Sequence, residues 1–346
     1  MSEPGFSTPG MDRLWSARRR LERIAAFEVG LARAWEAHGA PAGSASAVGA
    51  AFAAVLAAVD SEAAARGLLA EGWQAGSALL PLLERARDRL AATEPQAVAW
   101  LHRGATSQDA LDTALALSLR DALRELSGEL ARLDELLGSL SARHGQREVL
   151  GRTLLQPAVP LRFASRIERW RRPAAELAAE AAARAGALPV QLGGPVGDGA
   201  SFAGFAAQLR VALADELGLA EPGGSWHTDR RPVVSAVELA AAAARAGAQV
   251  AYDLALLAQP EIGELRLRAG RSSSMAHKRN PIDSARALAA ADACRGVASV
   301  VTGARPYELE RSLGAWHAEW FAAPLAFAAA AACVAAAADA VASIEL

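Results

Sequence analysis

The sequence predicts an all-α protein, an elongated bundle of long helices with a small helical domain at its N-terminal end. Of the 346 residues, 52% are hydrophobic but only 5% are aromatic. Much of the apolar content is Ala and Leu, the residues that lose least on entering a helix. Between residues 115 and 140, leucines recur in steps of three and four. This spacing marks one face of a single long amphipathic helix.

The elements follow from the same periodicity. Residues 1–106 carry shorter helical patterns and are predicted to form the N-terminal domain, and residues 107–346 the central bundle. The long helix is predicted to begin at a cap, Asp109 or Asp112, and to end near His144. Further helices are predicted over residues 161–187, 234–259 and 282–303 and from 316 onward. Several long helices joined by short loops form a helix bundle.

Segments without helical periodicity separate these helices. Pro157 and Pro160 are predicted to supply the break before the second long helix. Residues 188–199 hold four glycines and two prolines, which predicts a loop. The Ala-rich run 322–342 is long enough to suggest a membrane span, but Asp339 and the Ala content favour a buried bundle helix.

Composition excludes several functional classes. The net charge of -2 gives no electrostatic footprint for nucleic acid or an anionic membrane. Cys294 and Cys333, the two cysteines, indicate no disulfide framework, and no metal-ligand spacing occurs, so neither a metal nor a cofactor is expected. The N-terminus lacks a charged segment followed by an apolar one, which predicts a cytoplasmic protein.

The segment from Arg271 to Pro281 carries the densest chemistry. It holds three hydroxyls, an imidazole, three cations and a carboxamide, with no aliphatic helical stripe. Such a run predicts a loop, and loops on a rigid scaffold commonly bind substrates. Lys278 and Asn280 are suited to hold a carboxylate, with Ser272 close by in sequence. The alternative is a solvated charged loop.

Two further segments place polar groups near helix starts. Thr106 and Ser107 directly precede the long helix, where hydroxyls and backbone N–H groups form an anion site. The alternative is a cap that only satisfies the helix N–H groups. Arg311 and His317 lie in a segment with two tryptophans and two glutamates, 310–320. Its alternative is an amphipathic helix start with the tryptophans in the core.

Together these motifs resemble the fumarase/aspartase superfamily. The resemblance includes His102-x-Gly-Ala-Thr-Ser-Gln-Asp, Gly151-Arg-Thr-Leu-Leu-Gln, Trp226-His-Thr, Ser272-Ser-x-Met-x-x-Lys-x-Asn and Gly314-Ala-Trp-His-Ala-Glu-Trp. Within the superfamily these motifs are most similar to a cycloisomerase branch. The resemblance implies a homotetramer of long-helix bundles in which each active site is assembled from three subunits.

The resemblance also implies roles for individual residues. Ser272 matches the catalytic serine, and His317 is assigned with it to catalysis; His102 and His277 are alternatives for moving the proton. The residues assigned to substrate binding are His102, Thr106, Ser107, Thr153, Gln156, Lys278, Asn280 and Arg311.

Three features depart from the superfamily pattern. Arg271 stands where the signature loop usually has Gly, and Ala276 where it has Pro. Leu154 occupies the position at which members that expel an amine or a base have His. The chain ends soon after residue 320, so the usual C-terminal domain of the superfamily is expected to be absent.

The implied reaction interconverts 3-carboxy-cis,cis-muconate and its lactone in aromatic degradation by the β-ketoadipate pathway. The substrate is a small tricarboxylate, and neither nucleic acid nor membrane is a partner. A departing amine needs a general acid, whereas a carboxyl group with a pKa of about 4 departs as an anion. Leu154 therefore favours cycloisomerisation. The alternatives are an adenylosuccinate- or argininosuccinate-type lyase and a catalytically silent structural oligomer.

Overall fold

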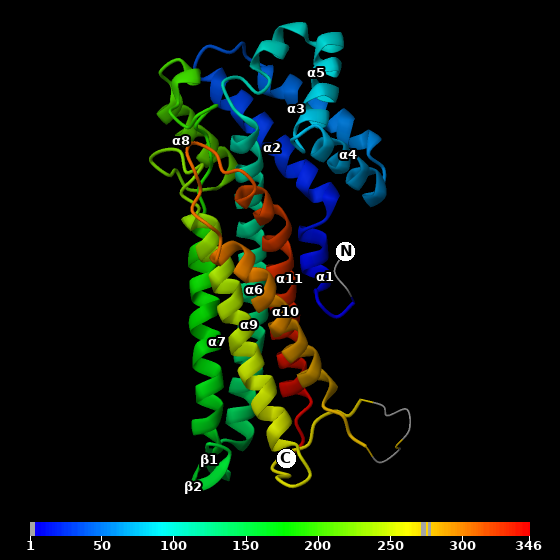
Figure 1. Cartoon of the computed structure of the whole chain (residues 1–346), viewed down its shortest axis with the longest axis vertical. Helices are drawn as coiled ribbons and strands as arrows, with labels where there is room; N and C mark the ends of the chain where they lie inside the picture. Colours follow the sequence, from blue (N-terminus) through cyan, green and yellow to red (C-terminus); the bar gives the residue numbers. More distant parts are fainter. Residues whose placement is uncertain (1–3, 271–274, 276–277) are drawn as a thin grey trace.

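The computed structural model describes residues 4–270, 275 and 278–346. Within that part of the chain, five long helices run along the molecule and alternate in direction (Figure 1). They are α6 (Ser107–His144), α7 (Phe163–Gly186), α9 (Arg231–Leu257), α10 (Ile282–Thr302) and α11 (Ala315–Ala342). The predicted all-α bundle is confirmed, and the later four helices begin within three residues of their predicted starts.

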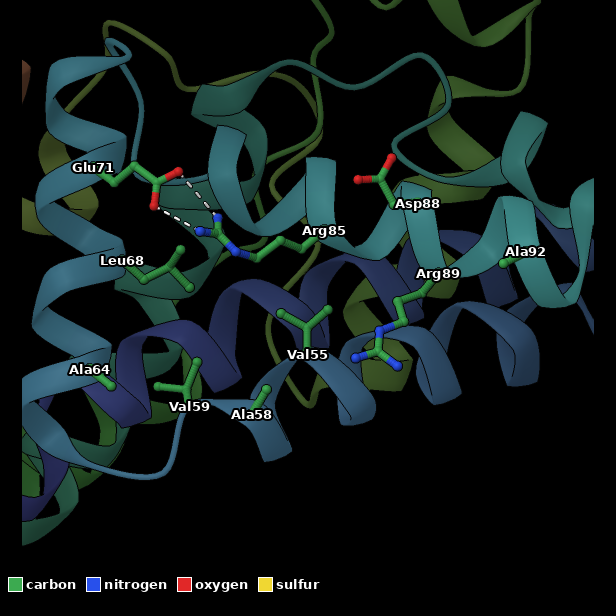
Figure 2. A pocket seen from close by; sticks show the side chains of 10 residues that line it. All are labelled: Val55, Ala58, Val59, Ala64, Leu68, Glu71, Arg85, Asp88, Arg89 and Ala92. Carbon is green, nitrogen blue, oxygen red and sulfur yellow. Dashed lines mark hydrogen bonds and ion pairs between the residues drawn. The ribbon is translucent and has the colours of Figure 1, made fainter.

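The shorter helices gather at the end of the bundle where α6 begins, except that α1 lies against the side of the bundle (Figure 1). They are α1 (Pro9–Leu14), α2 (Ala17–Glu36), α3 (Ser44–Ala58), α4 (Glu62–Gln74), α5 (Leu80–Thr93), the 3-10 helices η1 (Pro95–Trp100) and η2 (Ala200–Phe202), and α8 (Ala206–Leu217). The domain boundary at residue 106 stays a prediction. A cavity of about 570 Å³ lies between α3, α4 and α5, beside an ion pair from Arg85 to Glu71 at 2.8 Å (Figure 2). It lies apart from all the predicted site residues.

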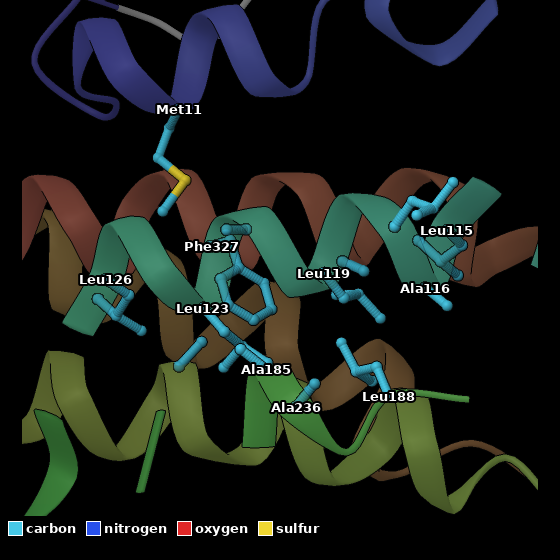
Figure 3. Close-up of a cluster of buried hydrophobic side chains, with 14 of the residues drawn as sticks. Met11, Leu115, Ala116, Leu119, Leu123, Leu126, Ala185, Leu188, Ala236 and Phe327 are labelled. Carbon is cyan, nitrogen blue, oxygen red and sulfur yellow. The ribbon is translucent and has the colours of Figure 1, made fainter. Parts of the chain in front are cut away.

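The leucine stripe of α6 is the core of the bundle. Leu119, Leu123 and Leu126 are fully buried, and the burial continues through Leu137. Figure 3 shows this stripe facing Phe327 of α11, with Met11 of α1 pointing toward α6 from outside the bundle. One continuous apolar face therefore holds the helices together and ties α1 to them.

Two bundle helices, α9 and α11, are long and apolar enough to cross a membrane by length and composition. In α11, 78% of the most apolar stretch is buried inside the protein. The small alanines of α11 allow α9 to approach closely. At Gly247 of α9, the Cβ of an alanine would lie 3.1 Å from the Sγ of Cys333 on α11, which leaves little room for a side chain. The interpretation of residues 322–342 as a buried bundle helix is confirmed.

A two-stranded hairpin departs from the helical prediction. Strands β1 (Glu148–Thr153) and β2 (Gln156–Arg162) pair antiparallel between α6 and α7. The sequence analysis treated Pro157 and Pro160 only as a break between helices. Both lie on β2, which has just one neighbouring strand, so their missing N–H groups leave no ladder bond unmade.

The start of α6 also differs in detail from the prediction. Thr106 is the N-cap, and Asp109 closes a capping box by accepting a hydrogen bond from the backbone N of Thr106 at 3.0 Å. Asp112 is no cap: it is fully buried and pairs with Arg230, whose Nη1 lies 2.7 Å away. A capping role was predicted for Asp112 because its ion-pair partner is more than a hundred residues away in sequence.

Truncation of the leucine stripe should destabilise the bundle. Leu130 is fully buried in α6, so Leu130→Ala should lower the free energy of unfolding by about 2–5 kcal/mol. Leu313→Ala is the matched control, because Leu313 is 78% exposed. Urea denaturation followed by circular dichroism measures both changes. Equal effects of the two substitutions would contradict the placement of the core.

Candidate active site

Several predicted site residues meet at the N-terminus of α6. Arg311 donates through Nη2 to the Thr106 Oγ1 at 2.7 Å and through Nε to the Gln108 Oε1 at 3.1 Å. Ser107, the first residue of the helix, is half-buried beside Thr106. A guanidinium, two hydroxyls and the positive end of the helix dipole thus converge, which is an arrangement suited to a carboxylate.

Asp109 organises this end of the bundle. Its carboxylate is fully buried and accepts hydrogen bonds from the backbone N atoms of Gly193 at 2.8 Å and Gly194 at 2.9 Å. The Nε2 of His227 lies 3.0 Å from its Oδ1. The predicted loop 188–199 is therefore fixed against α6. Gly194 has φ 75°, and a Cβ there would lie 2.3 Å from the Ser201 Oγ, so only glycine fits.

A buried ion-pair network positions the start of α11. Arg230 donates to Asp112 at 2.7 and 2.9 Å and through Nε to Glu319 at 3.0 Å. The Trp316 indole donates to Oδ1 of Asp112 at 2.8 Å, the oxygen that also accepts from Nη2 of Arg230, and the Tyr307 hydroxyl donates to Glu319 at 2.6 Å. Burial opposes the charge of Arg230, but the two carboxylates outweigh it and raise the pKa of Arg230. The tryptophans and His317 are thereby held in a fixed orientation.

The histidines assigned to the site have opposite environments. The Nδ1 of His102 lies 2.7 Å from an oxygen of the fully buried Glu28. Burial lowers the pKa of His102, but the carboxylate of Glu28 outweighs it, and the pKa is raised. His317 packs between Trp316, 4.9 Å away between ring centroids, and Trp320, 4.8 Å away. Burial, with the charge of Arg311, lowers the pKa of His317.

The remaining described site residues lie at the far end of the bundle. Thr153 and Gln156 are exposed at the hairpin tip, beyond the C-terminal end of α6 (Figure 1). Lys278 is exposed and Asn280 half-buried before α10, at the same end (Figure 1). Since α6 spans 38 residues, roughly 57 Å at 1.5 Å per residue separates the two ends. One chain does not bring the two groups together.

The hairpin tip presents an unusual apolar turn. Leu154 is 97% exposed, and both Leu154 and Leu155 have positive φ, at 50° and 63°. Leucines rarely adopt this conformation, and such strain collects at functional sites. Below the tip, Arg166 ion-pairs with Glu264 at 2.8 Å, and Arg152 also contacts Glu264.

The signature loop is described only in part. Ser272, Arg271, Ala276 and His277 lie outside the described residues. The backbone N of Gly270 donates to the carbonyl of Asn280 at 2.9 Å, which brings the two ends of the loop together. Lys278 is the only lysine in a sequence with 36 basic residues. In this chain arginine supplies every other side-chain cation.

Sequence reasoning missed the buried partners. Glu28, Asp109 and Arg230 hold site residues in place, yet none was assigned a role at the site. His227 lay within a recognised Trp-His-Thr motif, which was a usable signal. Glu28 had none, because it pairs with His102 across 74 positions of sequence.

The long-helix bundle and the sequence motifs match the fumarase/aspartase superfamily. A family model described as lyase matches residues 8–303. The chain belongs to this lyase family.

Individual relatives within this family are named for particular reactions. The chain is 38% identical over 327 residues to a 3-carboxy-cis,cis-muconate cycloisomerase of Pseudomonas aeruginosa, covering 91% of this chain and 69% of the relative. It is 39% identical over 243 residues to a nitrosuccinate lyase of Streptomyces davaonensis, covering 67% of this chain and 51% of that protein. The crystal structure of the 3-carboxy-cis,cis-muconate lactonizing enzyme from Pseudomonas putida is similar with a TM-score of 0.88 and 32% identity, covering 99% of this chain and 76% of that one.

The opposite environments of the two histidines predict opposite titration. His102 should titrate above its ordinary pKa of 6.5 and His317 below it. The contribution of His102 to stability is present below pH 6.5 and lost as the pH rises through its raised pKa. That of His317 is present above pH 6.5 and lost as the pH falls through its lowered pKa.

Ring NMR of isotope-labelled histidine measures both values, with His102→Gln and His317→Gln variants to assign the signals. If His317 titrated at a higher pH than His102, the described environments would be contradicted.

Proposed function

We propose that this protein interconverts 3-carboxy-cis,cis-muconate and its lactone, in the β-ketoadipate route of aromatic degradation. Relatives that cover most of the chain are named for this substrate. The observation that carries the proposal is Leu154, an apolar side chain at the tip of an exposed, strained hairpin. Superfamily members that expel an amine have a proton-donating histidine there, and a cycloisomerase has no need of one.

The chemistry fits the residues available. In the lactone-opening direction, a base removes the proton from the carbon beside a carboxylate, and the electron pair forms an enediolate. The enediolate then expels the lactone oxygen as a free carboxylate, and a carbon–carbon double bond forms. Ser272 is the proposed base, with His317, His102 and His277 as alternatives. Lys278 and Asn280 stabilise the enediolate through preorganised charge and hydrogen bonds.

The three carboxylates of the substrate require separate anchors. Thr106, Ser107 and Arg311 form one at the N-terminus of α6, where the Arg311 Nη2 already lies 2.7 Å from the Thr106 hydroxyl. Lys278 and Asn280 form the second. The exposed Thr153 and Gln156 add hydrogen bonds at the hairpin. Bidentate and charge-assisted contacts of this kind fix both position and orientation.

These anchors require more than one copy of the chain. The two groups lie at opposite ends of α6. A complete site therefore needs the hairpin end of one subunit beside the end of another subunit at which α6 begins. We infer a homotetramer with shared active sites. The exposed apolar side chains of Leu154, Leu155 and Val159 on the hairpin support this, because a soluble monomer rarely exposes such a patch. We also propose that the enzyme is cytoplasmic.

A second candidate is the elimination of nitrite from nitrosuccinate, the substrate named for the Streptomyces relative. Nitrite, like a carboxylate, is the anion of an acid that is ionised at neutral pH. An apolar residue at position 154 therefore suits both reactions. Direct assay of both substrates separates them.

Shared sites predict recovery of activity on mixing two inactive variants. Ser272→Ala and Arg311→Met change opposite ends of the site, and each alone should be nearly inactive. Refolding the two together should restore about a quarter of the wild-type rate. When a symmetric oligomer assembles at random, about a quarter of its sites combine an intact Ser272 from one subunit with an intact Arg311 from another. Loss of diene absorbance of 3-carboxymuconate measures the rate, and light scattering the tetramer.

The matched control mixes Ser272→Ala with Lys278→Met. Both changes lie on one loop, so no activity should return. A monomer that is active, or equal recovery in both mixtures, would contradict the shared site.

The role of Lys278 predicts a change in both kinetic constants. Lys278→Met should raise KM and lower kcat, by about 10²–10³ for the loss of one preorganised contact to the developing charge. Lys278→Arg should recover substrate binding more than turnover, because its planar fork does not reproduce a compact ammonium group. Steady-state kinetics tests both variants. Unchanged constants in Lys278→Met would remove the signature loop from the proposed site.

Leu154 separates the enzymatic alternatives. If the leaving group is an anion, Leu154→His should give no gain on 3-carboxymuconate. If the protein were an amine- or purine-releasing lyase, the restored imidazole should raise its rate by roughly 10²–10⁴. Wild type and variant are assayed against 3-carboxymuconate, nitrosuccinate, adenylosuccinate and argininosuccinate. A large gain on either of the last two would overturn the cycloisomerase assignment.

A further inference from the structure

A second cavity lies where the N-terminal helices meet the bundle. Its volume is about 490 Å³, and its lining comes from α1 and α2, α4, α6 and α11. Its polar lining residues are Trp15, Ser16, Arg20, Arg23, Glu62, Arg66, Ser118 and Trp320. None of the residues assigned to the active site lines it.

The charges in this cavity do not balance. Arg23 ion-pairs with Asp121 at 2.8 Å, and Arg66 with Glu62 at 3.3 Å. Arg20 has no ion pair with any described residue, and its guanidinium lies 5.3 Å from the centre of the Trp320 ring. Burial lowers the pKa of Arg20 to about 10. The cavity thus holds one half-buried cation that has no ion pair among the described residues.

Hydrogen-bond donors around the cavity also lack acceptors. The indole N–H groups of Trp15 and Trp320 and the Nε–H of Arg23 are buried and have no hydrogen-bond partner among the described residues. Arg23 is only 4% exposed. A buried donor without an acceptor costs free energy, and native proteins rarely leave several around one cavity. These three donors lie behind the cavity wall, so the exposed part of Arg20 is the group that a ligand can reach.

We propose that this cavity binds a small organic monocarboxylate with an apolar or aromatic body. Its carboxylate pairs with the guanidinium of Arg20, which lines the cavity and has no ion pair with a described residue. Its body lies against Leu69, Leu115 and Leu325, which line the other walls. The carboxylate of Glu62 also lines the cavity, where it accepts from the backbone N of Ala17 at 2.9 Å. That negative charge disfavours ligands with further carboxylates, so the tricarboxylate substrate does not fit.

Benzoate is the test ligand, measured by calorimetry and by the fluorescence of Trp15 and Trp320. The full-length protein with Lys278→Met is used, so that the proposed active site lacks one of its two carboxylate anchors, and the Arg20 and Arg19 variants decide whether binding occurs in the cavity. Benzoate should bind saturably, and benzamide, which lacks the charge, at least about tenfold more weakly. Arg20→Gln in the same background should weaken benzoate binding by about tenfold or more.

Arg19→Gln is the matched control. Arg19 is the adjacent residue of α2, pairs with Glu22 at 3.1 Å and does not line the cavity, so benzoate affinity should be unchanged. Arg20→Gln should fold normally, because it removes a buried charge that has no partner. If it does not fold, Trp15→Phe replaces it, since Trp15 lines the cavity and a smaller ring should weaken the packing of benzoate. The proposal is overturned if benzoate does not bind the Lys278→Met protein. It is also overturned if the cavity substitutions and Arg19→Gln affect binding equally.

Discussion

The buried carboxylate of Asp109 is the contact on which the end of the bundle at the N-terminus of α6 depends. It joins three segments that are distant in sequence: the first turn of α6, the glycine loop at residues 193–194, and His227 before α9. Burying a carboxylate is costly unless N–H groups surround it, and here they do. Because Asp109 accepts from the Thr106 backbone, the same contact decides where α6 begins. The position of Thr106 then decides where Arg311 can bind.

One turn further along α6, Asp112 extends this arrangement to α11. Through Arg230 it is linked to Glu319, so the first turns of the two helices are locked together. Removing one member would leave an uncompensated buried charge, which costs more than a lost contact. Trp316 and His317 occupy the helix turn held by this network. The part of the proposed site at the N-terminus of α6 is therefore preorganised by Asp112, Arg230 and Glu319, which are not themselves assigned to substrate binding.

The sequence could predict the bundle because helical periodicity is a local signal. Leucines at steps of three and four mark a helix wherever their partners lie, and the helix bounds followed closely. The hairpin was missed because both strands are short and neither sequence alternates apolar with polar residues. In addition, β2 is almost wholly exposed and contains two prolines. The motifs pointed to Thr106, Ser107 and Arg311, which the structure brings together. Their supports could not be predicted, because Arg230 and Glu319 are 89 positions apart.

Three arginines and the single lysine have different proposed roles in this chain: these arginines support the fold, and the lysine acts in the reaction. Arg152 and Arg166 both contact Glu264 below the hairpin, and Arg230 sits between two carboxylates. Arginine suits such positions because its planar fork binds carboxylates in a fixed geometry and stays charged. Lys278 is the exception in a chain that otherwise uses arginine. An ammonium on a flexible stem can follow a carboxylate as its charge grows into an enediolate, which a rigid fork does less well. The single lysine therefore lies where the proposed reaction needs an adaptable charge, whereas Arg152, Arg166 and Arg230 lie where the fold needs a fixed one.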